Sequence, residues 1–398
     1  MSRVDEIAHQ TSVSSSDLGS VVSKELLHCI QCGNCSGICP LGFAMEFPPS
    51  RMISAMRAGI FSHVTSSDSV WLCIACSACT TACPTLIPIT EELMRTTKEE
   101  LILSGNIPAE LQSAFENSQR YGNPMGESPR KRADWTESLG FEIPVLGRES
   151  PDADVLWFVG DYSSYHPVVR SATIAFARIL HTLGINFGIL GNQESSDGDS
   201  QRLAGEKGLF EILAEKNARA LGKVNVSRVI TTDPHAFNAF KNAYPEIGIT
   251  YPVQHYTQFL VEKMDLLKKH IKKEVKAKVT FHDPCYLGRV NGIYDEPRDL
   301  IKAIPGVELV EMQHHHQNSL CCGGGGGGMW LDGFQWEKTH VRSSEWRIQE
   351  VVDAGADTLV VACPYEKPRF LDAVKNVPGA QEIKVLDLSE LLLESFGK

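Results

Sequence analysis

Cysteine spacing is the feature of this chain that most directly predicts chemistry. Its twelve cysteines form two compact runs and one dispersed group, with no thiol left over. Both runs have the spacing C-x2-C-x2-C-x3-C-P, which is typical of two [4Fe–4S] clusters, and the dispersed group supplies the four thiolates that one further cluster needs. The three groups are Cys29, Cys32, Cys35 and Cys39; Cys73, Cys76, Cys79 and Cys83; and Cys285, Cys321, Cys322 and Cys363.

The usual ligand pattern of paired runs predicts which cysteines share a cluster. The first three cysteines of one run and the fourth of the other bind one cluster, so Cys83 joins the first run's trio and Cys39 joins the second's. Zinc is the alternative, but zinc sites pair C-x-x-C units without the triple run. Disulfides are disfavoured in a cytosolic chain of this size.

The dispersed group needs a sharp turn of the backbone, because Cys321 and Cys322 are adjacent. Six glycines, Gly323 to Gly328, follow them. Glycine lets the backbone approach a cluster and direct N–H groups at its sulfides, so Gly323, Gly324 and Gly325 are candidate cofactor-binding residues. The alternative is a flexible loop beside two buried thiols. The run does not follow a strand as a dinucleotide-binding loop would.

Composition indicates a globular chain of 398 residues with a net charge of −11. The acidic balance and the absence of a basic stripe argue against nucleic-acid binding. The N-terminal sequence has no secretory pattern and no window is apolar enough to span a membrane, so we expect a cytoplasmic protein whose membrane link, if it has one, is a partner.

The order of apolar patterns predicts an α+β multidomain chain. Residues 1–110 hold both cysteine runs, and helical spacing at Met52, Met56 and Ile60 predicts a mostly helical module. A Gly- and Pro-rich stretch in 111–150 indicates a linker. Short apolar strands then alternate with helical patterns, which predicts two α/β domains with parallel sheets, at 151–270 and 271–398.

These two domains form an internal repeat in which only the second copy keeps its cysteines. Asp161 corresponds to Cys285, Ser196-Asp197-Gly198 to Cys321-Cys322-Gly323, and Asp233-Pro234 to Cys363-Pro364, at offsets of 124, 125 and 130 residues. We infer common ancestry of the two copies. Asp161, Asp197 and Asp233 could form a carboxylate site, but the favoured interpretation is polar filling of a vacated, partly solvated pocket.

The pattern Cys285…Cys321-Cys322-Gly323…Cys363-Pro364 resembles the cysteine-rich CCG domain of heterodisulfide reductase. The order of parts, a helical ferredoxin domain and then two CCG domains, is similar to the D subunit of that enzyme or a fusion of its C and B subunits. The resemblance extends to the soluble iron–sulfur subunits of anaerobic respiratory complexes, among them the K subunit associated with dissimilatory sulfite reductase. It implies two [4Fe–4S] clusters in the ferredoxin domain and a third, cubane or non-cubane, in the C-terminal domain.

Two departures from the family pattern bear on function. The first copy has lost every cysteine, and the second ends Cys363-Pro364-Tyr365-Glu366 where the family has C-P-x-C. Glu366 is therefore a weak oxygen ligand that leaves an exchangeable position, a proton acceptor, or a carboxylate at a helix N-terminus without a role.

The resemblance implies a redox subunit with Cys285, Cys321, Cys322, Cys363 and Glu366 as its catalytic residues. These would reduce a disulfide or oxidise thiols of a small molecule or carrier protein, with electrons relayed by the ferredoxin clusters. The alternative is a non-catalytic electron-transfer subunit between a flavoprotein or cytochrome and a membrane quinone module. In either case we expect a partner subunit of the cytochrome b or flavoprotein type, holding the protein at the inner face of the membrane.

Histidines near the third group are weaker candidates. His282 precedes Cys285 closely, and either a capping role or contact with a ligand explains it. The run His314 to His316 has the character of a surface loop, with proton tuning or substrate contact as the alternative.

Overall fold

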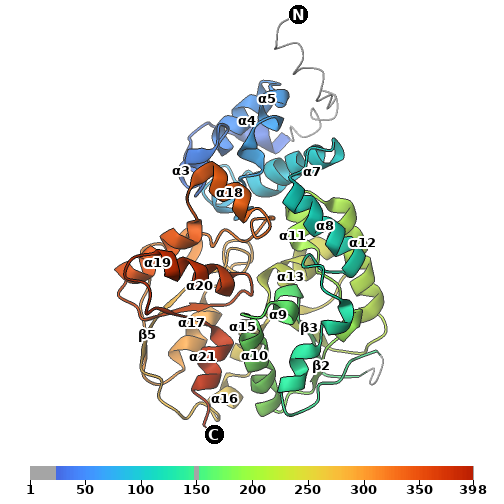
Figure 1. The fold of residues 1–398 in the computed structure, drawn as a ribbon, viewed down its shortest axis with the longest axis vertical. Helices are drawn as coiled ribbons and strands as arrows, with labels where there is room; N and C mark the ends of the chain where they lie inside the picture. Colours follow the sequence, from blue (N-terminus) through green and yellow to red (C-terminus); the bar gives the residue numbers. More distant parts are fainter. Residues whose placement is uncertain (1–23, 148–151, 398) are drawn as a thin grey trace, which may run out of the picture. The chain divides into compact units, whose positions relative to one another are not determined.

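The computed structural model describes residues 24–147 and 152–397, which divide into two compact units (Figure 1). The first unit contains residues 24–112, 200–207 and 325–341. The second contains residues 113–199, 208–324 and 342–397. Each unit is therefore assembled from segments that lie far apart in the sequence.

The first unit is mostly helical. In α4 (Pro49–Arg57) Met52 and Met56 are buried, as the helical spacing predicted, but Ile60 lies beyond the end of this helix and is 44% exposed. Its other regular elements are η1 (Lys24–His28), α3 (Asn34–Gly37), η2 (Gly42–Ala44), α5 (Phe61–Thr65), η3 (Asp68–Val70), α6 (Ala78–Thr81), η4 (Ile89–Arg95), α7 (Thr96–Leu103), the first residues of α8 (Ala109–Tyr121), most of α11 (Asp199–Leu203) and α18 (Asp332–Thr339).

The two cysteine runs fold alike. In each, the chain enters a one-turn helix, α3 or α6, after two residues with positive φ: Gln31 and Gly33 in the first run, Ala75 and Ser77 in the second. Left-handed conformations of non-glycine residues cost about 1–3 kcal/mol each and are concentrated at functional sites. Their repetition at matching positions indicates that both runs are shaped around the same kind of ligand.

The second unit contains two parallel sheets of four strands with the same strand order. The first sheet has the order β2-β1-β3-β4, and its strands are β1 (Val155–Phe158), β2 (Phe187–Gly188), β3 (Arg228–Thr231) and β4 (Val253–His255). The second has the order β6-β5-β7-β8, with β5 (Ala277–Phe281), β6 (Val307–Leu309), β7 (Thr358–Val361) and β8 (Lys384–Asp387). The predicted fold class is thus confirmed, and the shared order agrees with the internal repeat.

Helices connect the strands, as parallel pairing requires. The first copy has α9 (Asp161–Tyr165), α10 (Arg170–Thr182), η7 (Gly191–Gln193), α12 (Lys207–Leu221), α13 (Pro234–Asn238), η8 (Ala239–Ala243), α14 (Tyr244–Glu246), α15 (Tyr256–Glu262) and α16 (Met264–Leu267). The second has α17 (Asp295–Lys302), η9 (His316–Asn318), α19 (Ser343–Asp353), α20 (Glu366–Asn376) and α21 (Leu388–Glu394).

The two copies share a hydrophobic core. Helix α10 of the first copy packs against α21 of the second, and α15 of the first packs against α17 of the second. Because α10 is the equivalent of α17 and α15 is the equivalent of α21, the two contacts are related by a pseudo-twofold axis. Buried side chains of both sheets, such as Trp157 and Phe281, belong to one cluster. Burying such large apolar side chains contributes about 1.5–3 kcal/mol each, so the copies stabilise one another.

Each sheet places its strand ends where ligands usually bind. In open parallel sheets the binding crevice lies beyond the carboxyl ends of two neighbouring strands whose connections leave in opposite directions. That point falls between β5 and β7, which lead to Cys285 and Cys363, and between β1 and β3, which lead to Asp161 and Asp233. The same topology therefore carries thiols in one copy and carboxylates in the other.

Of the segment 111–150, predicted as a linker, residues 113–147 belong to the second unit. It contains most of α8 and the turns η5 (Pro129–Lys131) and η6 (Asp134–Ser138). Trp135 is buried with its ring centroid 5.2 Å from that of Trp157, and Arg132 is 2% exposed. The domain boundaries proposed from the sequence stay a prediction.

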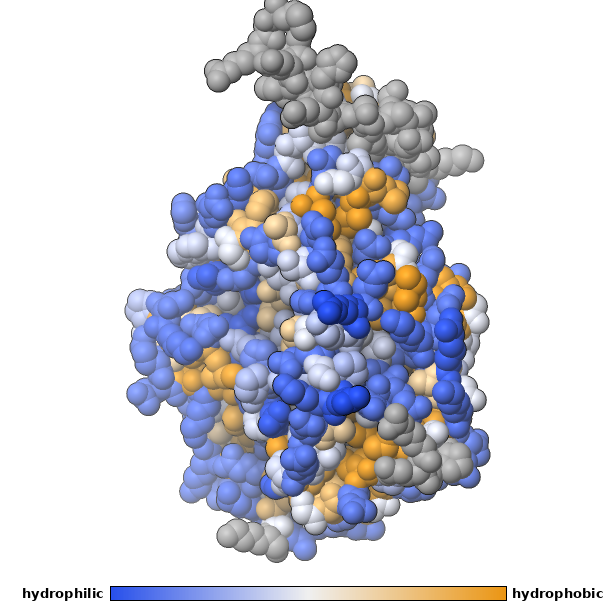
Figure 2. Space-filling view, turned by 45° about the vertical axis from the view of Figure 1, so that its right-hand side comes forward, coloured by the Kyte–Doolittle hydropathy of each residue, from blue (hydrophilic) through white to orange (hydrophobic). Residues whose placement is uncertain are grey.

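Polar side chains predominate on the face seen in Figure 2, where hydrophobic residues form several small groups. Among the helices within 24–147 and 152–397, none combines the length and the apolar character needed to cross a lipid bilayer.

Candidate iron–sulfur centres

The eight cysteines of the first unit lie in the two sets that the spacing predicts. Burial raises the pKa of Cys35, and the neighbouring thiols of Cys29, Cys83 and Cys32 raise it further. The pKa values of Cys39 and Cys79 are raised by burial and by thiols of the second set in the same way. The fourth cysteine of each run therefore lies with the first three cysteines of the other run. The resulting two groups of four sulfur donors fit two [4Fe–4S] clusters.

The two sets differ in exposure. Cys32 is exposed and Cys29 is partly exposed, whereas Cys76 and Cys79 are buried. An apolar pocket opens beside the second set and is lined by Cys39, Cys73, Cys76, Cys79 and neighbours such as Met45 and Met94. The first set thus lies nearest to solvent within its unit, and an external redox partner can approach it most closely.

A buried lysine adds a second indication of an anionic group at the second set. Lys98 is 1% exposed, and its Nζ donates to the carbonyl oxygens of Cys73 (2.8 Å) and Gly326 (3.1 Å). Burial lowers its pKa, and the negative charge of the Cys73 thiolate opposes this shift. A buried cation needs a compensating negative charge. A thiolate-bound cluster beside Cys73 supplies it, so the residues present fit such a group.

Lys98→Met should lower the reduction potential of the cluster held by Cys39, Cys73, Cys76 and Cys79. As a general scale, a unit charge about 10 Å from another in an effective dielectric of about 20 contributes about 1.7 kcal/mol. This corresponds to more than a tenfold change in the reduction equilibrium, or over about 59 mV. Redox titration followed by electron paramagnetic resonance measures the shift. Lys338→Met, which removes a half-exposed cation of the same unit, should leave both ferredoxin potentials in place; an equal shift in this control would contradict the assignment.

The glycine run has two different surroundings. The N–H groups of Gly323 and Gly324 point at the sulfurs of Cys321 (3.3 Å) and Cys322 (3.4 Å), as expected for glycines at a cluster. Gly325 to Gly328 belong to the first unit instead. A Cβ on Gly326 would lie 2.5 Å from the Cβ of Ala75, which is too close for any other residue. Glycine is therefore needed here, because the glycine run packs directly against the second cysteine run. The six glycines therefore do not all surround the third site.

The third group of cysteines is brought together beyond the ends of β5 and β7. All four are buried. A hydrogen bond with Cys321 raises the pKa of Cys285, as does burial, and the same partner lowers the pKa of Cys322. Burial raises the pKa of Cys363, with Glu366 and Asp233 nearby. Four converging thiols are again a donor set that fits an iron–sulfur cluster.

Glu366 and His282 complete this site. Glu366 is the first residue of α20 and is 1% exposed, with its Oε1 3.3 Å from His282 Nε2. One donor atom each from His282, Cys322 and Glu366 lie within 4.8 Å of one another. Burial raises the pKa of Glu366 strongly, and its Oε2 has no hydrogen-bond partner among the described residues. An unsatisfied buried oxygen among thiols is typical of a ligand position or a proton site, rather than of a helix-capping carboxylate.

The imidazole of His282 is fixed from its other side. Arg347 is fully buried and its Nε donates to His282 Nδ1 over 3.0 Å. Burial and the positive charges of Arg347 and Arg289 lower the pKa of His282, so the ring is neutral. Neutral imidazole with Nδ1 as acceptor carries its proton on Nε2, directed at Glu366. His282 therefore donates to the carboxylate.

The histidine run lies near this site without joining the thiols. His314 contacts Glu350, and the backbone N–H of His316 donates to Asp283. Side-chain donor atoms of Glu311, His315 and His316 lie within 4.8 Å of one another, but Glu311 is already held by Arg298. Asp283, also held by Arg298, orders the loop before Cys285.

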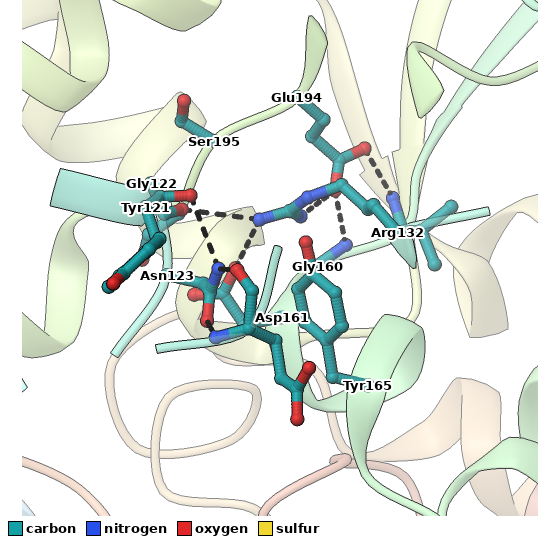
Figure 3. Close-up of polar contacts among 12 residues, drawn as sticks. Tyr121, Gly122, Asn123, Arg132, Gly160, Asp161, Tyr165, Glu194 and Ser195 are labelled. Atoms are coloured by element: carbon teal, nitrogen blue, oxygen red, sulfur yellow. Dashed lines mark hydrogen bonds and ion pairs between the residues drawn. The ribbon is translucent and has the colours of Figure 1, made fainter. Parts of the chain in front are cut away.

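In the first copy, the pocket equivalent to the third site is filled by an ion-pair network (Figure 3). Arg132 is held between Asp161 (2.5 Å) and Glu194 (2.6 Å), and Glu194 also accepts from the backbone N–H groups of Val159 and Gly160. Asp161 is 3% exposed and Asp233 is 1% exposed. The expectation of a partly solvated pocket is therefore wrong, because Arg132 supplies the charge that allows dry burial.

The remaining polar residues of this pocket are paired as well. Asp233 caps α13 by accepting from the N–H of His235, whose ring Nδ1 donates to Asp199 over 2.8 Å. Asp197 accepts from the backbone N–H of Asp199. Among the residues that the structure describes, no three donor side chains in this pocket lie close enough to hold a metal ion. The carboxylates are a hydrogen-bonded filling rather than a metal site.

Several residues that complete these sites were not among the sequence candidates: Lys98, Arg132, Glu194, Asp199, His235 and Arg347. The sequence did indicate that a cation such as Arg132 was needed. An aspartate in the position of a buried cysteine requires a nearby positive charge. Lys98 and His235 carry no local pattern that separates them from surface residues.

Comparison with known proteins agrees with this division of the chain. Residues 25–87 match the 4Fe-4S dicluster domain, and residues 279–365 match the cysteine-rich domain called CCG. One relative is the D subunit of the dihydromethanophenazine:CoB–CoM heterodisulfide reductase of Methanosarcina barkeri. The two are 29% identical over 97% of this chain and 98% of the relative.

Two further relatives are longer than this chain. The chain is 31% identical to the "Probable iron-sulfur-binding oxidoreductase FadF" of Bacillus subtilis, over 93% of this chain and 60% of that protein. It is 31% identical to the EtfAB:quinone oxidoreductase of Syntrophomonas wolfei, over 86% of this chain and 49% of that protein. The chain therefore spans about half to three fifths of these two proteins. It is an iron–sulfur protein with a 4Fe-4S dicluster domain and a CCG domain, related to the D subunit of heterodisulfide reductase.

Proposed function

We propose that this protein is the iron–sulfur subunit of a redox complex and exchanges electrons with a thiol–disulfide pair at the site formed by Cys285, Cys321, Cys322, Cys363 and Glu366. The observation that carries the proposal is Glu366, which is buried among these thiols with one oxygen unpartnered in the described part of the chain. A carboxylate holds iron less tightly than a thiolate does, so this is the position where a sulfur ligand can exchange. The end-to-end similarity to a heterodisulfide reductase subunit supports the same chemistry.

The side chains have distinct roles in this proposal. An iron–sulfur cluster at the third site would supply one electron at a time, and the eight cysteines of the first unit would hold the two clusters that relay electrons. Gly323 and Gly324 direct N–H groups at the sulfurs, which favours the reduced, more negative state. His282 donates to Glu366 and keeps its carboxylate oriented.

The names of the relatives support a proposal for the partner and for the location. The partner proposed here is a flavoprotein or a membrane cytochrome b-type subunit. One relative is named EtfAB:quinone oxidoreductase, which supports a place in a redox complex. Another relative is named as a probable membrane-anchored ferredoxin, which supports attachment to a membrane. The inner face of the membrane stays our proposal for the location. The likeness to the K subunit associated with dissimilatory sulfite reductase stays a prediction from the motifs.

A second function is favoured by a different observation. The third-site cysteines are at most 8% exposed, and a 31% identical relative is named as EtfAB:quinone oxidoreductase. In this case the chain transfers electrons between a flavoprotein and a quinone module and has no thiol substrate of its own.

Electron paramagnetic resonance of anaerobically purified protein separates the two functions. The protein is oxidised stepwise with and without small thiols, such as coenzyme M and sulfide. A signal with S = 1/2 in the oxidised state that changes with the added thiol is expected from thiol–disulfide chemistry. Signals that appear only on reduction and do not respond to thiols would instead establish the electron-transfer function.

Cys322→Ser provides the matched test of the ligand set. It removes one of four thiols of the third site and none of the eight in the first unit. We expect complete loss of the third signal, with both ferredoxin signals retained and iron reduced by about one cluster's content. Retention of all three signals would overturn the assignment of the third site.

A further inference from the structure

The cysteine-free copy contacts the third site directly through aromatic rings. Both copies lie in the second unit. The ring of Tyr162, next to Asp161, lies 4.4 Å from that of Tyr365, and the ring of His235 lies 4.5 Å from that of Tyr286. Tyr286 follows Cys285, and Tyr365 lies two residues after Cys363. The two contacts are equivalent under the internal repeat, so the pocket that lost its cysteines abuts the one that kept them.

His235 occupies the position that Tyr365 has in the second copy, and it is the titratable member of this contact. It is 3% exposed, and its ring is also 5.3 Å from that of Tyr365. Its Nδ1 donates to Asp199 over 2.8 Å, and Asp199 in turn accepts from the amide of Asn238 over 2.9 Å. A buried histidine oriented by a fixed carboxylate is the usual arrangement of a proton donor and acceptor in proteins.

The charged groups around His235 favour its protonated form. Asp199, Asp233 and Asp197 face it from the first copy, while Tyr286 and Tyr365 face it from the second. Burial lowers the pKa of His235, but Asp199, Asp233 and Asp197 outweigh burial, so the pKa lies above 6.5. Burial raises the pKa of Asp233 to about 6 against the opposing charge of His235. The imidazolium of His235 and the carboxyl of Asp233 therefore both hold a proton more tightly than the free groups do.

We propose that the His235–Asp199 pair is the proton donor and acceptor for redox change at the third site, so that the first copy has exchanged a cluster for proton storage. This rests on the proposed function, in which a disulfide R–S–S–R′ takes up two electrons and two protons to give R–SH and R′–SH. The S–S bond breaks and two S–H bonds form. The two electrons would come one at a time from a reduced flavoprotein partner, through the clusters that the ferredoxin cysteines would hold. One proton leaves the imidazolium of His235 and the other comes from solvent, and the pair regains its proton from solvent before the next turnover.

The test is the pH dependence of the third site's reduction potential, measured by redox titration between pH 6 and 9 without any thiol. Reduction takes up a proton only where His235 is neutral in the oxidised protein. In that range we expect the reduction equilibrium of the native protein to change about tenfold per pH unit, or about 59 mV, and at lower pH, where His235 is already protonated, we expect no slope. His235→Gln should remove this slope while the third signal and the iron content persist. An unchanged slope in His235→Gln would overturn the proposal.

Two further variants make the result specific. His255→Gln replaces another buried histidine of the same copy, whose pKa burial lowers to about 3, so that it stays neutral throughout the titration; its slope should equal that of the native protein. Asp199→Asn removes the negative charge that stabilises the proton on His235, so the pH range in which the reduction potential changes with pH should move to lower values. This variant tests the proposal even if His235→Gln does not fold. Because no thiol is present, a failure of the thiol–disulfide function leaves this test intact. Loss of the slope in His255→Gln as well would contradict the role of His235.

Discussion

Arg132→Met is expected to destabilise the second unit by about 3–5 kcal/mol, the typical cost of removing one partner from a buried ion pair. Arg132 is 2% exposed and lies between two carboxylates that are buried as well, Asp161 and Glu194. Methionine fills much of the volume but leaves both charges without a cation. Urea unfolding followed by tryptophan fluorescence should show this loss, since Trp135 and Trp157 lie in the core of that unit.

Two comparisons separate charge from packing in that experiment. Combining Arg132→Met with Asp161→Asn and Glu194→Gln removes the unpaired charges and should recover most of the lost stability, because replacing a whole buried ion pair is often nearly neutral. Arg219→Met breaks an exposed i,i+4 pair with Glu215 and should cost below about 0.5 kcal/mol. If the triple variant is no more stable than the single one, packing rather than charge explains the effect.

The same residue shows where sequence reasoning stopped. The repeat offsets identified Asp161 and Asp233 as the counterparts of Cys285 and Cys363, and the sheets confirm the strands on which this alignment was based. The partner of Asp161 could not be found, because Arg132 lies in a Pro- and Arg-rich stretch, SPRKR, with every local sign of a linker. Its two carboxylates are 29 and 62 residues away. Long-range pairing of this kind leaves no periodic signal.

The prediction from the glycine run was incomplete for a related reason. Six consecutive glycines after Cys321 and Cys322 predicted one close approach of backbone to cluster, and Gly323 and Gly324 do direct N–H groups at sulfur. Gly326 serves another contact, against Ala75 of the second cysteine run. Glycine indicates that backbone comes close to something, but its neighbour is decided by tertiary packing, which a single sequence does not reveal.

The free energy of unfolding below neutral pH should depend on one buried carboxyl group, at the end of β8. Asp387 caps α21, accepting from the N–H of Ser389 over 2.8 Å, and is 6% exposed. Burial raises its pKa to about 6, with Glu390 adding to the rise and Ser389 and Lys367 opposing it. The folded state therefore binds a proton that the unfolded chain, with a pKa of about 3.8, has released.

The sign follows from that difference. Because the folded pKa is raised, the stability that Asp387 contributes is complete below about pH 3.8 and is lost as the pH rises through about 6. Between pH 4.5 and 7.5 this amounts to about 2 kcal/mol. Asp387→Asn keeps an oxygen that can cap the helix but cannot titrate. The free energy of unfolding of the native protein minus that of the variant should therefore fall by about 2 kcal/mol across this range.

A second variant moves the effect in a known direction. Ser389→Ala removes a hydroxyl that donates to the Asp387 carboxylate over 2.5 Å. Without this donor the ionised form is less stable, so the pKa of Asp387 should rise and the loss of stability should extend to higher pH. Urea unfolding at half-unit pH intervals measures both variants. A native protein and Asp387→Asn with parallel pH profiles would show that this carboxyl ionises alike in the folded and unfolded chain, and burial at the end of β8 would then not control its charge.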